Sequence, residues 1–211
     1  MKKFLTRLAF VASAAAAALA PSAASANGPI IFVHGYSGSG SNWDTMASRF
    51  VASGYPSNQL YKFDYASLIN SNRVSASQLG NLVNTVRSRH GGAKVNIIAH
   101  SNGGLVSRWY LVMQGGQNNT RRFISLGSPH SGTTWAYACV SPACLEMRPL
   151  STFLISLAGR GCDRSLWSTV DGIILPATSA ACGRSRMTAA VNHLALLTDS
   201  RVYNDVRAEL Q

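Results

Sequence analysis

The most informative part of the sequence is Val95-Asn96-Ile97-Ile98-Ala99-His100-Ser101-Asn102-Gly103-Gly104. A run of β-branched apolar residues ends in a tight turn of small residues, and an apolar stretch with helical spacing follows. A serine at the centre of such a strand–turn–helix unit is held in a strained backbone conformation with its hydroxyl exposed. Its neighbours must be small, and Ala99 and Gly103 meet this need in the pattern A-x-S-x-G. Ser101 is therefore the candidate nucleophile.

The rest of the sequence alternates predicted strands with predicted helices. We expect strands at residues 29–33, 60–63, 95–99, 122–126, 166–170 and 187–191, and helices at residues 43–54, 77–89, 105–114 and 200–210. This alternation predicts an α/β fold with a mostly parallel sheet of about six strands, covered by helices on both faces. In such sheets the reactive groups gather at the carboxyl ends of the strands.

Residues 127–165 interrupt this alternation, because they contain no clear sheet strand. The segment is rich in aromatic and aliphatic residues and holds three of the four cysteines. Long connections of this kind usually serve a function. We interpret residues 128–165 as a small cap over the cleft, and the alternative is an ordinary helix and loop packed on the sheet.

The N-terminus has the pattern of an export signal. Three cations among the first seven residues precede an apolar run at residues 8–20, and Ala24-Ser25-Ala26 then offers a small-residue cleavage site. The apolar run is shorter than the ~18 residues that span a bilayer, although an uncleaved membrane anchor is the alternative reading. We expect a signal peptide at residues 1–26, one catalytic domain at residues 27–211, and an extracellular protein.

Export determines how the cysteines are read. An even number of cysteines in an oxidising compartment favours disulfides, and their spacing does not match a zinc-binding pair. Three pairings are open, and we favour Cys139–Cys144 with Cys162–Cys182 because short loops close most readily.

The net charge of +11 at pH 7 is strongly basic. The arginines are scattered, and Arg121-Arg122 is the longest basic run, so the basic stripe of a nucleic-acid-binding protein is absent from the sequence. We interpret the charge as a soluble basic surface, which could also be attracted to anionic envelopes or fatty-acid-coated droplets.

A serine nucleophile needs a base within hydrogen-bonding reach, and that base needs an orienting acid. Among the five histidines, His34 and His100 flank glycine turns, His90 ends a predicted helix and His130 lies in a turn. His193 follows a predicted short strand and directly precedes the last predicted helix. The base of an α/β hydrolase occupies this place in the chain order, so His193 is the candidate base.

The acid can be sought by elimination among the eight Asp and Glu residues. Only Glu146, Asp163 and Asp171 follow the serine and precede the candidate base. The first two fall in the predicted cap beside cysteines, whereas Asp171 directly follows a predicted strand. Asp171 is the candidate acid and Asp163 the reserve; the alternative role of Asp171 is to form a turn with the glycine after it.

An oxyanion hole requires two backbone N–H groups that point at the developing negative charge. The residue after the nucleophile supplies one, which is Asn102. The glycine-rich loop at residues 34–40 follows the first predicted strand and places the amide of Tyr36 as the second. That loop lacks the lysine of a phosphate-binding P-loop.

The sequence resembles secreted bacterial lipases of the small α/β-hydrolase type, the Bacillus lipase A group of class 2 lipases. The resemblance covers nearly all of residues 27–211 and is carried by Ile31-Phe32-Val33-His34-Gly35, by residues 96–104, by Leu166-Trp167-Ser168-Thr169-Val170-Asp171 and by Val191-Asn192-His193-Leu194-Ala195-Leu196-Leu197. It implies the α/β-hydrolase fold, with nucleophile Ser101, acid Asp171, base His193 and oxyanion amides from Tyr36 and Asn102. Alanine at the first position of the serine turn is also a family trait.

The chain departs from that group in two respects. The smallest members have neither cysteines nor a lid, whereas this chain has four cysteines and the long segment after Gly127. Asn102 stands where the Bacillus enzymes have methionine, a change that leaves the backbone amide in place.

These features predict a secreted carboxylic-ester hydrolase, a lipase or esterase that acts through an acyl-enzyme. We expect a lipid or other small ester as substrate, contact with a lipid–water interface, a monomer, no nucleic-acid partner and no cofactor. No metal is expected, because the sequence has no cluster of carboxylates that would build a calcium site. The alternatives are a serine hydrolase for a polyester or thioester, and an inactive hydrolase fold that only binds.

Overall fold

The computed structural model describes residues 28–211, so the predicted signal peptide lies outside the described residues. The strands are β1 Ile30–Val33, β2 Leu60–Phe63, β3 Val95–His100, β4 Thr120–Leu126, β5 Arg164–Trp167 and β6 Arg184–Met187. The α-helices are α1 Asp44–Ala52, α2 Asn72–Arg89, α3 Asn102–Met113, α4 Pro142–Met147, α5 Thr152–Leu157 and α6 Ser200–Glu209. None of the helices described is long and apolar enough to cross a membrane.

All six strands form one sheet in the order β2-β1-β3-β4-β5-β6, and every neighbouring pair is parallel. The prediction of a parallel sheet of about six strands is confirmed. β1 and β3 are buried along their whole length, as expected for central strands that are covered on both faces. Val33 pairs with Ala99, so the loops that follow β1 and β3 leave the sheet side by side.

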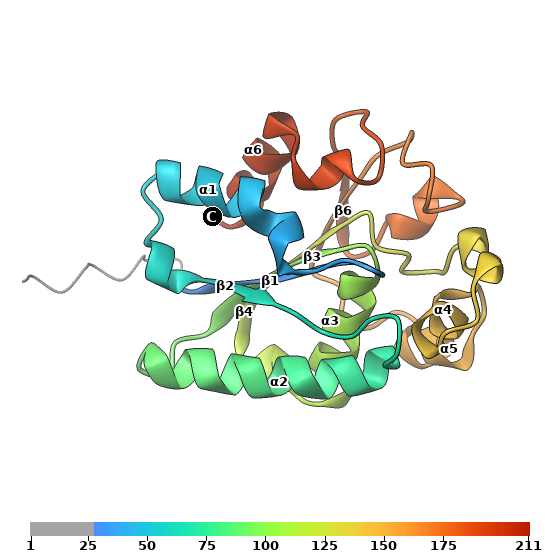
Figure 1. Cartoon of the computed structure of the whole chain (residues 1–211), viewed down its shortest axis with the longest axis horizontal. Coiled ribbons are helices and arrows are strands. Elements are labelled where there is room, and N and C mark those ends of the chain that lie inside the picture. Colours follow the sequence, from blue (N-terminus) through green and yellow to red (C-terminus); the bar gives the residue numbers. More distant parts are fainter. Residues whose placement is uncertain (1–27) are drawn as a thin grey trace, which may run out of the picture.

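Helices cover both faces of the sheet (Figure 1). α1 and α6 lie on one face and α2 and α3 on the other. Phe50 of α1 and Val202 of α6 join the apolar core of the first face. Leu79 of α2 and Val106 of α3 join the core of the second. The sheet is therefore the middle of three layers, which holds the carboxyl ends of its strands in a fixed relation.

Several predicted boundaries are wrong. α2 begins at Asn72, five residues before the predicted start, because the hydroxyl of Ser71 caps it by accepting from the Val74 amide at 3.3 Å. β5 and β6 begin two and three residues before their predicted starts and end at Trp167 and Met187. β6 is the outermost strand and all four of its residues are exposed, so it lacks the apolar alternation that reveals a half-buried strand.

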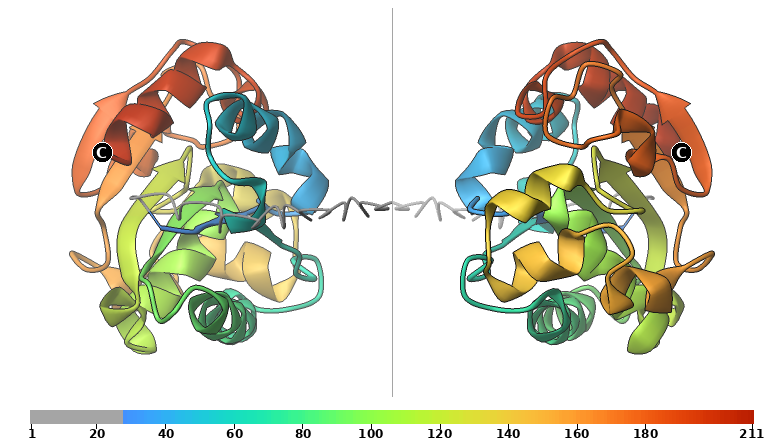
Figure 2. Two further views of the ribbon diagram at one scale, coloured as in Figure 1. Left: turned by 90° about the vertical axis from the view of Figure 1, so that its left-hand side faces the viewer. Right: turned by 90° about the vertical axis from the view of Figure 1, so that its right-hand side faces the viewer.

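Residues 127–163, here called the β4–β5 segment, connect those two strands. The segment contains a 3-10 helix at Thr134–Ala138, α4 and α5. Its apolar side chains form a small core of their own against Leu105 of α3. It lies beside α3, as the right-hand view of Figure 2 shows. The predicted disulfides, Cys139–Cys144 within the segment and Cys162–Cys182 at its end, are confirmed.

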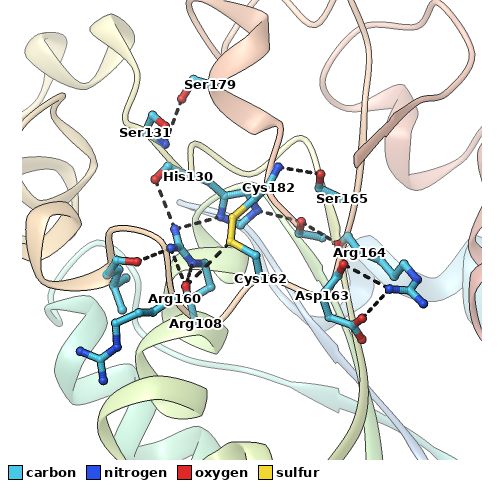
Figure 3. The surroundings of a disulfide bond; sticks show 12 residues. Arg108, His130, Ser131, Arg160, Cys162, Asp163, Arg164, Ser165, Ser179 and Cys182 are labelled. Atoms are coloured by element: carbon cyan, nitrogen blue, oxygen red, sulfur yellow. Dashed lines mark hydrogen bonds and ion pairs between the residues drawn. A yellow bond between two sulfur atoms is a disulfide. The ribbon is translucent and has the colours of Figure 1, made fainter. Parts of the chain in front are cut away.

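A buried arginine ties the β4–β5 segment to the sheet domain (Figure 3). The guanidinium of Arg108 on α3 donates to the carbonyl oxygens of Leu157 at 2.6 Å, Arg160 at 2.7 Å and His130 at 3.2 Å. Burial lowers the pKa of Arg108 to about 10, so the group stays charged at neutral pH. Leu157 ends α5, where carbonyl groups lack partners within the helix and attract a cation. Arg108 thus caps the C-terminus of α5 and fixes the segment to α3.

Arg108→Met is expected to lower the free energy of unfolding by about 3 kcal/mol, because it leaves several buried carbonyl groups without a donor. Urea unfolding followed by circular dichroism measures the change. Arg121→Met is the matched control, since exposed Arg121 donates to one carbonyl, that of Leu210. Equal losses for the two variants would contradict this account of Arg108.

Candidate active site

Ser101 lies in the sharp turn between β3 and α3. Its backbone has φ 53° and ψ −129°, a conformation that costs energy for any residue with a side chain. The turn is possible because glycines allow the surrounding backbone to come close. A Cβ at Gly103 would lie 2.4 Å from the His34 carbonyl oxygen, and one at Gly35 would lie 2.8 Å from Cβ of Ser101. The loop after β1 is therefore pressed directly against the serine.

His193 and Asp171 form a buried hydrogen-bonded pair. Nδ1–H of His193 donates to Oδ2 of Asp171 at 2.8 Å, and the His193 amide donates to the Asp171 carbonyl oxygen at 2.9 Å. Oδ1 of Asp171 accepts from the amides of Ile173 at 3.0 Å and Ile174 at 2.8 Å. Burial alone would raise the pKa of the Asp171 carboxyl, but His193 and the two amides together lower it. The acid is thus held ionised, and Nε2 of His193 is left for another partner.

Ser101 and His193 line the same pocket, whose volume is about 140 Å³. Tyr36 from the loop after β1 also lines it, together with Leu194. Asn102 is the first residue of α3, so its N–H has no carbonyl partner within the helix. The predicted site residues follow four different strands. Tyr36 follows β1, Ser101 and Asn102 follow β3, Asp171 follows β5 and His193 follows β6.

The other carboxylates between Ser101 and His193 have partners elsewhere. Asp163 accepts from the Phe123 amide at 3.1 Å and pairs with Arg164 at 2.7 Å. Glu146 accepts from the Asn72 amide and pairs with Arg73. The described residues contain no group of three His, Cys, Asp or Glu side chains placed to hold a metal ion.

The immediate surroundings of the pair differ from the prediction. β5 ends at Trp167, so Asp171 stands four residues beyond the strand and does not follow it directly. A 3-10 helix, Ala195–Leu197, lies between His193 and α6. The first difference follows from the displaced boundary of β5, and the second is an additional element that the sequence did not predict.

Residues 27–209 match the family model of lipase class 2. The chain belongs to the class 2 lipase family. Among solved structures it is similar to Bacillus licheniformis lipase BlEst2 in its mature form, with a TM-score of 0.76, 18% identity, and coverage of 89% of this chain and 93% of that one. It is also similar to Aspergillus fumigatus lipase B, with a TM-score of 0.72, 16% identity, and coverage of 83% of this chain and 50% of that one. The structural matches show the shared α/β-hydrolase fold, and family membership supports hydrolysis of esters.

Gly127 is a site residue of this class 2 lipase that sequence reasoning missed. It directly follows β4 with φ 53°, and a Cβ there would lie 2.6 Å from Cδ1 of Leu196, 2.8 Å from Oδ2 of Asp171 and 3.4 Å from Nδ1 of His193. The Asp171–His193 pair therefore packs directly against the backbone of Gly127. A glycine at the carboxyl end of a strand beside the serine strand was the signal in the sequence.

His100 is a second missed residue. Its Nε2–H donates to the His193 carbonyl oxygen at 2.9 Å, and the two rings lie 4.4 Å apart. Burial, and after it the nearby His193, lowers the pKa of His100 to about 3. His100 is thus neutral at ordinary pH and fixes the loop that carries His193.

Gly127→Ala is expected to lower kcat/KM for a soluble p-nitrophenyl ester by about 10- to 100-fold, because the added methyl group displaces Asp171 from His193. Gly115→Ala is the matched control, in a loop away from the site. Gly115 also has a positive φ, of 70°, and a Cβ there would meet no atom within 4 Å. A similar loss of kcat/KM in both variants would assign the effect to backbone strain alone.

Acid is expected to destabilise this lipase below pH 6.5. Burial is the main cause that lowers the pKa of His34, His100 and His130, so these imidazoles take up protons on unfolding as the pH falls below about 6.5. For His100 this costs about 1.4 kcal/mol per pH unit. Urea unfolding between pH 7.5 and 5 should show a free energy of unfolding that falls with falling pH, and His100→Gln should reduce that slope by this amount. An unchanged slope would contradict the prediction.

Proposed function

We propose that the chain is a carboxylic-ester hydrolase with a triad of Ser101, His193 and Asp171. Family membership supports the reaction class. The observation that carries the residue assignment is the buried 2.8 Å hydrogen bond from His193 to Asp171, beside a pocket that His193 shares with Ser101. A base oriented by an ionised acid and facing a strained serine is the arrangement that nucleophilic acyl transfer requires.

In the proposed reaction, Oγ of Ser101 attacks the ester carbonyl while Nε2 of His193 takes the serine proton. Asp171 keeps Nδ1 protonated and stabilises the imidazolium that forms. The N–H groups of Tyr36 and Asn102 bind the oxyanion of the tetrahedral intermediate. His193 then returns the proton to the leaving alcohol, and a water molecule repeats the attack on the acyl-enzyme to release the carboxylic acid.

We propose lipid esters as the substrate class. Large apolar side chains are exposed beside the oxyanion loop. Leu194 lines the pocket itself and is 70% exposed. Leu68 and Ile69 follow Ser67, whose hydroxyl accepts from the Ser37 amide. Trp135 lies against the ring of Tyr36. An apolar rim of this kind favours acyl chains and a lipid–water interface over polar substrates.

We further propose that the chain is exported after cleavage behind Ala26 and acts as a monomeric single domain without a cofactor. The two disulfides support an oxidising compartment. N-terminal sequencing of the protein from the culture medium tests the cleavage site.

The first test is the hydrolysis of p-nitrophenyl esters from acetate to palmitate by the mature protein. Ser101→Ala is expected to lower kcat by at least ~10³-fold without loss of folding, and a fluorophosphonate should label the wild type and not the variant. A rate that rises when long-chain substrate forms an interface would support a lipase.

Activity confined to short soluble esters would restrict the proposal to an esterase. Activity only on polyesters or thioesters would overturn the lipid-ester assignment and keep the triad. Absence of both labelling and turnover would overturn the enzyme proposal in favour of a binding protein.

A further inference from the structure

α4 touches the surroundings of both proposed oxyanion donors. It belongs to the β4–β5 segment, outside the loops that carry the triad. Its N-cap, Ser141, contacts Tyr36, and Glu146 near its other end contacts the residue that holds Asn102. Two contacts from one short helix to the two halves of an oxyanion hole are the basis of this inference.

The first contact is between two hydroxyl groups. The hydroxyls of Tyr36 and Ser141 lie 2.9 Å apart, and the ring of Trp135 packs edge-on against Tyr36 at 6.2 Å. Ser141 has little freedom, because its hydroxyl also accepts from the Cys144 amide at the start of α4. It lies inside the loop closed by the Cys139–Cys144 disulfide. The side chain of Tyr36 is therefore tied to a covalently closed turn.

The second contact is a chain of hydrogen bonds that is partly buried at Glu146 and buried beyond it. Glu146 accepts from the Asn72 amide at 2.6 Å, and the side chain of Asn72 accepts from Nδ2 of Asn102 at 2.7 Å. Nδ2 of Asn102 also lies 3.4 Å from the Tyr65 hydroxyl, which donates to the His34 carbonyl oxygen at 2.8 Å. Asn72 and Asn102 are fully buried. The chain thus links α4, α2, the serine turn and the loop after β1.

We propose that α4 is a positioning element of the oxyanion hole, with Ser141 and Glu146 as its positioning residues. The inference rests on the proposed function, because it assigns the oxyanion to the amides of Tyr36 and Asn102. Oxyanion donors accelerate acyl transfer only when they are fixed before charge develops. The Tyr36 loop is rich in glycine, and its later part is held by bonds from the Ser37 amide to Ser67 and from the Gly40 amide to Asp64. The bond from Ser141 holds that loop, and the chain from Glu146 holds the first turn of α3.

The inference makes α4 a support that stays in place during turnover, in contrast to a lid that must leave. Loss of a support weakens binding of the transition state and leaves binding of the ground state unchanged, so it lowers kcat and not KM. Loss of a lid contact would change access to the site, and hence KM or the response to an interface.

The test compares two serines of the same segment. The Ser141 hydroxyl bonds to Tyr36 and accepts from the Cys144 amide, whereas the Ser156 hydroxyl donates within α5, to the Thr152 carbonyl oxygen at 2.8 Å. On p-nitrophenyl butyrate, Ser141→Ala should lower kcat about tenfold with KM unchanged, and Ser141→Thr should restore it. Ser156→Ala also removes a hydroxyl from the segment and should keep the wild-type kcat.

Tyr36→Phe keeps the proposed oxyanion amide and loses only the hydroxyl. It should lower kcat as much as Ser141→Ala does. The kcat of the double variant should fall no further, because both substitutions remove the same interaction.

The second contact, through Glu146, is tested in the same way. Glu146→Ala should lower kcat, and Glu146→Gln, which keeps an oxygen for the Asn72 amide, should recover most of it.

Values of kcat within twofold of wild type in Ser141→Ala and Tyr36→Phe would overturn the inference. Equal losses in Ser141→Ala and Ser156→Ala would also overturn it, since they would reflect a general effect of removing a hydroxyl from the segment. A wild-type protein without activity would instead overturn the proposed function, so the two failures are distinguishable.

Discussion

Gly103 has no room for a side chain, because the carbonyl oxygens of Val33 and His34 would lie within 2.5 Å of its Cβ. This close approach joins the start of α3 to the end of β1. It requires β1 and β3 to be neighbours in register, and it requires the chain to turn within one residue, which puts Ser101 at positive φ. The layered sheet supplies the rigidity that this turn needs. The position of the serine turn against the loop after β1 depends on this constraint.

Some features of the fold could be predicted because they leave a local pattern in the sequence: an apolar run for a buried strand, a periodic pattern for a helix, or glycines for a turn. β1 is apolar throughout, β3 is mostly apolar, and glycines closely follow both strands. Their positions and the serine turn could therefore be predicted from the sequence. The scarcity of acids reduced the search for a partner of His193 to three residues, one of which the structure brings to it. Chain order, together with a place just before the last predicted helix, selected His193 as the candidate base.

What could not be predicted depends on contacts between distant residues. β6 has no apolar alternation because it is exposed at the edge, and its residue Arg186 pairs with Asp205 and Glu209 of α6. The packing of Gly127 against the acid–base pair is a relation between β4 and two later loops. The neutral state of His100 follows from burial, which no local pattern encodes. The sequence does not distinguish Arg108 from a surface cation, yet it lies in the interior and caps the C-terminus of α5.

The β4–β5 segment is continuous in sequence, which makes it look like a cassette that could be exchanged between related enzymes to alter the range of acyl chains accepted. Its hydrogen bonds to Tyr36 and Asn72 limit such an exchange. A grafted segment that fills the same space without equivalents of Ser141 and Glu146 would change selectivity and slow turnover together. Exchange at this position therefore has two design targets: the exposed apolar side chains near the proposed site, and the polar side chains that face the sheet domain. Libraries built on this scaffold should vary the first set and hold the second constant.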